Sequence, residues 1–151
     1  MKPAFLILLI LLHISLLWAQ ERPLNTGLTA KEQYAFIGMM LSDIIEKYGP
    51  PRTVAAARGN ELWQDDVVFQ YTGVDFYIFK DRVWQLKFST THDISIGDKK
   101  PAVLLIFGEK AEDMEDHVLM AIDGYDWPLM LRVNFNNTEN VVSIFLYRPD
   151  Y

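Results

Sequence analysis

The side chains best suited to chemistry in this chain lie in two separate stretches. Asp65 and Asp66 stand together before an apolar run, and Asp116 and His117 close the acidic segment 112–117. Paired carboxylates can exchange protons, and carboxylates together with an imidazole can bind a divalent metal ion. A small hydrolase or a metal-binding protein would require all four side chains to meet in space.

The spacing of these residues does not define a catalytic or metal site. The chain has no cysteine, and His117 lacks the second histidine of the common zinc-binding motifs. Runs of charge are usually solvated, and His92, in segment 90–93, is interpreted as a linker residue. We therefore expect a protein with no catalytic residue, no metal and no cofactor, and keep the acidic set as the alternative.

The first 19 residues have the layout of a secretory signal peptide. Lys2 supplies a positive charge, residues 4–18 are almost entirely apolar, and the polar segment 20–23 follows Ala19. A membrane-spanning helix needs ~20 apolar residues, so this shorter run favours cleavage after Ala19. Leu17 stands where a small residue is usual, and retention as an anchor is the alternative. We expect a periplasmic or secreted bacterial protein without stable membrane insertion.

The composition excludes several classes of partner. The chain has 20 Asp and Glu against 14 Lys and Arg, with a formal net charge of −6 and no basic run. Such a surface repels nucleic acid and anionic lipid. An exported chain without cysteine cannot use disulfides, so its stability must come from a packed apolar core. We expect one domain that binds no nucleic acid.

The predicted helices and strands occur twice along the chain in a similar order, and we call the two series the first and the second round. In the first, Thr29 followed by Glu32 predicts a capping box, and a second helix begins near Leu41 and ends at Gly49. Residues 52–60 are expected to form a loop. Strands are expected over residues 62–72, 75–80 and 82–89, with a tight turn at Lys80-Asp81.

The second round begins at Gly97. Residues 102–107 form a continuous apolar run that could be a buried strand. Pro101 suits a helix start, however, and the counterpart in the first round is helical, so we predict a helix over residues 99–107. Residues 110–116 are expected to form an acidic link. Strands are then predicted over residues 118–122, 128–135 and 141–148, with a hairpin loop over residues 136–140.

Matched glycines support two copies of one unit. Gly38 and Gly49 have the same separation as Gly97 and Gly108. Gly-x-Asp also recurs, and its aspartates, Asp75 and Asp126, are interpreted as turn residues. The predicted fold class is α+β, with two tandem helix-plus-antiparallel-sheet repeats. The strands form one continuous sheet or two adjoining ones, with helices on one side. The leader and helix start cover residues 20–36, and the repeats cover residues 37–89 and 96–148.

A short motif in each round resembles a known family pattern. Gly38-Met39, Ile44, Tyr48, Gly49 and Pro51 follow the form Gly-Met-[Thr/Ser]-x3-Val-x3-Leu-Gly-x-Pro, and the matching residues of the second round are Gly97, Val103, Phe107 and Gly108. This pattern is similar to that of the SmpA/OmlA (BamE-like) outer-membrane assembly lipoproteins and the beta-lactamase-inhibitor proteins. The resemblance covers residues 37–148. It implies a tandem-repeat fold and, from the inhibitor proteins, binding through a concave sheet.

Two predicted strands are apolar on both faces. Segments 76–79 and 141–147 carry more large side chains than one layer of helices can cover. Aromatic residues and arginine are the usual anchors of protein interfaces. We expect one sheet face to contact a protein partner in the envelope or exterior; its closure by the N-terminal segment, the other repeat or a second copy is the alternative. The expected contacts are Tyr77, Gln85, Lys87, Arg132, Asn134 and Arg148.

Overall fold

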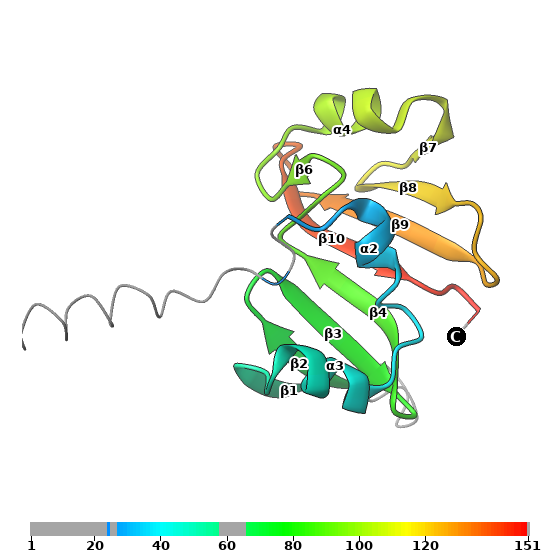
Figure 1. The fold of residues 1–151 in the computed structure, drawn as a ribbon. Coiled ribbons are helices and arrows are strands. Elements are labelled where there is room, and N and C mark those ends of the chain that lie inside the picture. Colours follow the sequence, from blue (N-terminus) through cyan, green and yellow to red (C-terminus); the bar gives the residue numbers. More distant parts are fainter. Residues whose placement is uncertain (1–23, 25–26, 58–65, 151) are drawn as a thin grey trace, which may run out of the picture.

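The computed structural model describes residue 24 and residues 27–57 and 66–150, which form one twisted sheet with short helices against it (Figure 1). The helices are α2 (Ala30–Tyr34), α3 (Leu41–Tyr48) and α4 (Lys100–Phe107), with a 3-10 turn η2 (Gly108–Lys110). The strands are β1 (Thr53–Ala57), β2 (Asp66–Tyr71), β3 (Val74–Phe79), β4 (Arg82–Phe88), β5 (Thr90–Thr91), β6 (Ile94–Ser95), β7 (Ala111–Asp113), β8 (His117–Ile122), β9 (Leu129–Phe135) and β10 (Val141–Tyr147). No helix of the described residues is long and apolar enough to cross a membrane.

Eight strands form a single antiparallel sheet in the order β1-β2-β3-β4-β10-β9-β8-β7, and β5 and β6 pair separately. The strands β4 and β10 pair directly, which joins the early and late strands. The predicted division into two tandem helix-plus-sheet repeats is therefore wrong. The described residues instead form a mostly antiparallel eight-stranded sheet, in which β4 and β10 pair side by side at the centre.

One hydrophobic core lies between the sheet and the helices. Strand β9 shows the pattern clearly, since every second residue from Leu129 to Phe135 is buried and the residues between them are half-buried. Ile44 of α3 and Val103 of α4 are fully buried in the same core. The helices therefore cover the sheet face to which these alternate strand residues point.

The predicted helix signals are confirmed. The Thr29 hydroxyl accepts a bond from the Glu32 amide at 3.3 Å, and the Glu32 carboxylate accepts one from the Thr29 amide at 2.8 Å. Gly49 closes α3 with a φ of 79°, which glycine adopts without strain. Residues 100–107 are helical, as Pro101 near the helix start indicates. Leu28, in the predicted leader, packs against the core.

Two segments expected to be irregular contain strands. Residues 53–57, predicted as loop, form β1 along β2, and residues 111–113 of the predicted acidic link form β7 along β8. Both are edge strands. Their backbone hydrogen bonds to the neighbouring strand stabilise them although most of their residues have low β propensity. Residues 1–23, 25–26, 58–65 and 151 lie outside the described residues, with the predicted signal segment, the start of the 62–72 strand and Asp65 among them.

The tight turns have the backbone angles and the side-chain hydrogen bonds expected from their residue types. Lys80 and Asp81 both have positive φ, at 48° and 63°, so the predicted two-residue hairpin is confirmed. In the 136–140 loop, the Asn136 side-chain oxygen accepts bonds from the Thr138 and Asn140 amides, each at 3.0 Å. Asp75 is not a turn residue, because it is the second residue of β3. Asp126 lies in the connection between β8 and β9.

Candidate functional site

The sheet face turned away from the core carries most of the predicted contact residues. Facing pairs place two rows of side chains across the strands β3, β4, β10 and β9. The first row is Tyr77, Gln85, Tyr147 and Met130, and the second is Asp75, Lys87, Phe145 and Arg132. We call these eight residues, with Trp84 and Asn134, the open face. The described helices pack on the opposite side of the sheet.

An aromatic contact crosses the middle of the open face. The rings of Tyr77 and Phe145 meet edge to face, with 6.4 Å between their centroids. Burial raises the pKa of Tyr77, and the carboxylates of Asp75 and Asp66 raise it further. Tyr77 therefore remains a neutral phenol at neutral pH. Both rings are half-buried, so each has surface left to contact a partner.

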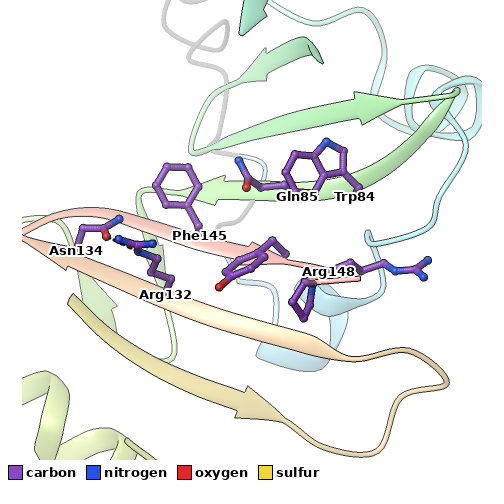
Figure 2. Close-up of a pocket in the computed structure, with 8 residues that line it drawn as sticks. Trp84, Gln85, Arg132, Asn134, Phe145 and Arg148 are labelled. Atoms are coloured by element: carbon purple, nitrogen blue, oxygen red, sulfur yellow. Dashed lines mark hydrogen bonds between the residues drawn. The ribbon is translucent and has the colours of Figure 1, made fainter. Parts of the chain in front are cut away.

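Two successive side-chain hydrogen bonds orient Arg132 of the second row. Arg132 Nε donates a 2.7 Å hydrogen bond to Asn134 Oδ1 (Figure 2). Asn134 Nδ2 in turn donates a 2.8 Å bond to the hydroxyl of Ser143. Arg132 and Asn134 lie on β9, and Ser143 pairs with Asn134 from β10. This relay holds the guanidinium in one orientation on the face.

Asp75 and Lys87 face each other on β3 and β4. Burial raises the pKa of Asp75, while the charge of Lys87 and a hydrogen bond from Gln70 oppose that rise. The raised pKa shows that burial outweighs the neighbouring charge. The end of the open face formed by Asp75 and Lys87 is thus polar, and its net charge is small.

A shallow hollow of about 450 Å³ runs along the centre of the open face (Figure 2). Its lining comprises Trp84, Gln85, Arg132, Asn134, Phe145, Tyr147, Arg148 and Pro149. The hollow is broad and open to solvent, and its walls are aromatic rings interleaved with amide and guanidinium groups. Such a surface suits contact with another macromolecule.

Trp84 reaches the open face because of a β-bulge. Strict alternation predicts Trp84 on the core side with Leu86, but Tyr77 pairs with Gln85 while Ile78 pairs with Val83. Trp84 is the extra residue, and its Nε1 donates a 3.0 Å bond to Asp66. Sequence reasoning also missed Phe145 and Tyr147, although the apolar excess of segment 141–147 indicated a second occupied face.

Arg148 lies at the end of the hollow and points away from Arg132 (Figure 2). Its guanidinium bonds Asp150 through Nη2 at 2.7 Å and through Nε at 3.0 Å, and it lies 5.2 Å from the ring centre of Trp127. Of the six predicted contacts, Tyr77, Gln85, Lys87, Arg132 and Asn134 share the open face. Arg148 marks its rim.

Of the four residues considered for hydrolysis or metal binding, the three that the structure describes do not all come together. Asp66 lies on β2, whereas Asp116 and His117 lie at the start of β8, with four strands between them. Five inter-strand spacings amount to about 24 Å. His117 Nδ1 and Asp116 Oδ1 are 2.5 Å apart, and this bond lowers the pKa of Asp116. The described residues contain no group of three or more acidic or histidine side chains that could hold a metal ion.

His92 is a packing residue and not merely part of a linker. It occupies the β5–β6 turn with a φ of 51°, and its ring lies 5.4 Å from that of Tyr34 and 6.4 Å from that of Phe107. Burial lowers the pKa of His92, although the Asp93 carboxylate opposes that shift. The side chain ties α2 to α4 on the core side, away from the open face.

Comparison with known proteins adds information on the fold. The sequence matches no family model and no curated protein sequence. A similar solved structure is the 1.5 Å crystal structure of an extracellular protein containing an SCP domain from Bacillus anthracis str. Ames, with a TM-score of 0.51 and 12% identity. The match covers 87% of this chain and 49% of that one, so the chain spans about half the length of its structural neighbour. The likeness concerns the fold alone and gives no support to two tandem repeats.

Proposed function

We propose that this protein is a non-enzymatic binding module that contacts a protein partner through the open face. The observation that carries the proposal is the convergence of Tyr77, Gln85, Lys87, Arg132 and Asn134 on one side of four adjacent strands. Aromatic rings, amides and an arginine are the groups that anchor protein interfaces.

The rigidity of the open face supports the same proposal. Its side chains project from strands in the centre of an eight-stranded sheet, and its key groups are already restrained by the Tyr77–Phe145 contact and the Arg132–Asn134 bond. A surface that is ordered before binding loses little conformational entropy when a partner docks. The inhibitor proteins that the Gly38-Met39 motif resembles also bind through a sheet.

We further propose that the protein is exported, with cleavage after Ala19. The apolar run 4–18 and the polar segment that follows it support this proposal. The structural neighbour is described as an extracellular protein. Intact-mass measurement of protein from its native host tests the proposal. A species that begins at Gln20 is expected, and a full-length species retained in membranes after a high-salt wash would contradict it.

Capture from a native envelope fraction tests the binding function. Tagged wild-type protein should recover a protein partner, and Tyr77→Ala and Phe145→Ala should each lose most of it. Leu105→Ala is the matched control, because Leu105 is an apolar residue of α4 that is 84% exposed and lies outside the open face. Circular dichroism and melting curves establish that each variant is folded. Equal recovery by folded wild-type and both open-face variants would refute the proposal.

A further inference from the structure

Arg132 stands at the β9 end of its row on the open face, between two apolar neighbours. Phe145 of β10 faces it on one side and Leu119 of β8 on the other. The side chain is half-buried against them. No carboxylate among the described residues forms an ion pair with its guanidinium. Arg132 therefore lies between one aromatic and one aliphatic residue, without a carboxylate in an ion pair with it among the described residues.

The orientation of Arg132 leaves its binding edge available. A guanidinium has five N–H donors, and Arg132 uses its Nε–H for the bond to Asn134. Within the described part of the chain, the Nη donors have no hydrogen-bond partner. These groups form the part of the planar fork that binds a carboxylate through two parallel bonds.

The nearby acidic group is already engaged. Asp116 is bonded to His117 at 2.5 Å, and its pKa is lowered first by that bond and only weakly by the charge of Arg132. Lys87 differs from Arg132, because it faces a carboxylate of its own in Asp75. The two rows contain two cationic residues, Lys87 and Arg132. Of these, Arg132 is the one that no acidic residue faces.

We infer that Arg132 binds an aspartate or glutamate side chain of the protein partner, in the hollow beside Phe145 and Tyr147. This inference rests on the proposed function. A partner that covered the open face would remove water from the guanidinium, and an unpaired buried charge is costly. A carboxylate from the partner removes that cost and gives charge-assisted bonds, while the surrounding rings exclude water. The acidic side chain then fixes the register of the partner on the sheet.

Nuclear magnetic resonance titration tests the site without knowledge of the partner. The probe is the blocked dipeptide acetyl-Phe-Glu-amide, and its matched neutral control is acetyl-Phe-Gln-amide. The Arg132 Nε–H and Asn134 side-chain amide signals should shift saturably with the glutamate probe, with at least about tenfold weaker affinity for the control, which corresponds to about 1.4 kcal/mol. Equal shifts with both probes, or no saturable shift with either, would overturn the inference.

Titration of protein variants tests whether Arg132 is the residue that binds the carboxylate. Arg132→Gln should abolish the response, and Arg132→Lys should weaken it, since an ammonium keeps the charge but loses the planar fork. Asn134→Leu should weaken it with the charge intact. Arg82→Gln is the control, because Arg82 is an exposed arginine at the β3–β4 turn, bonded to the Gly38 carbonyl. A response that survives in Arg132→Gln would contradict the assignment.

Partner capture separates this inference from the proposed function. If Tyr77→Ala loses the partner and Arg132→Gln loses at least about tenfold in affinity, both stand. If Tyr77→Ala loses the partner while Arg132→Gln binds like wild type, the open face is a binding surface but the carboxylate assignment is wrong. If neither variant affects capture, the proposed function fails and the inference fails with it.

Discussion

Leu86 of β4 and Leu146 of β10 face each other where the early and late strands of the sheet join, and neither side chain is exposed. On the other face of the same strand pair, Gln85 lies opposite Tyr147 and Lys87 opposite Phe145. The core contact and the open face are therefore two sides of one junction. Stability and binding should both depend on the pairing of β4 with β10.

Truncation at this junction should be costly. Leu146→Ala removes a fully buried side chain, and comparable core truncations cost about 2–5 kcal/mol of unfolding free energy. Chemical denaturation monitored by circular dichroism measures the loss. The exposed Leu105→Ala should change the unfolding free energy by only about 0.5 kcal/mol or less. A similar small change for Leu146→Ala would show that the junction is loosely packed.

The β3–β4 turn offers a stabilising substitution. Asp81 has a φ of 63°, a conformation that glycine adopts without the penalty of a Cβ atom. Asp81→Gly should raise the unfolding free energy by up to about 1 kcal/mol, because Gly suits the second position of a type I′ hairpin. Thermal melting measures the change. A lower melting temperature for Asp81→Gly would mean that the aspartate side chain supports the turn.

Asp75 should make stability fall as pH rises through its titration. Its pKa is raised above 3.8 by burial, so the folded protein holds this proton more tightly than the unfolded chain. Unfolding free energy is lost from about pH 3.8 upward, through the raised pKa, and the loss persists at neutral pH. Asp75→Asn should therefore be more stable than wild type at pH 7, with a difference that shrinks in acid. A less stable Asp75→Asn at pH 7 would show that attraction to Lys87 outweighs burial.

The contribution of His92 to stability should depend on pH in the opposite direction from that of Asp75. Burial lowers its pKa below 6.5, so its contribution to stability is complete above that pH and is lost as pH falls through the lowered value. Melting temperatures measured from pH 7.5 downward should fall more steeply for wild type than for His92→Asn, whose side chain tolerates the positive φ. Asp93→Asn removes the opposing carboxylate and should extend the loss to lower pH. Parallel pH profiles for wild type and His92→Asn would contradict this account.

Local signals predicted individual helices and turns, whereas the predicted fold class was wrong. The Thr29–Glu32 capping box, the Lys80-Asp81 turn and the helix over residues 100–107 each depend on residues close in sequence. The strand β1 was missed because its Thr-Val-Ala-Ala-Ala sequence does not alternate, and its strand geometry comes from pairing with β2. The pairing of β4 with β10 joins segments far apart in the chain, which no local pattern reports.

The candidate site was only partly predictable for the same reason. Alternation indicates which residues of one strand share a face, but the register between strands decides that Gln85, Tyr147 and Tyr77 form a row. The bulge that turns Trp84 to the open face breaks the alternation itself. The relay from Arg132 to Asn134 joins residues two apart on one strand, and its free guanidinium edge is visible only in three dimensions.

Site-specific photo-crosslinking tests the central claim most directly. A photoreactive phenylalanine analogue at position 145, in the centre of the open face, should form a covalent adduct with a protein partner in the native envelope fraction. The same analogue at position 105, exposed on α4, should not. Adduct formation at 145 alone is the result that this account predicts. Adducts at 105 with none at 145 would show that the partner binds the helical side and that the open face is not the interface.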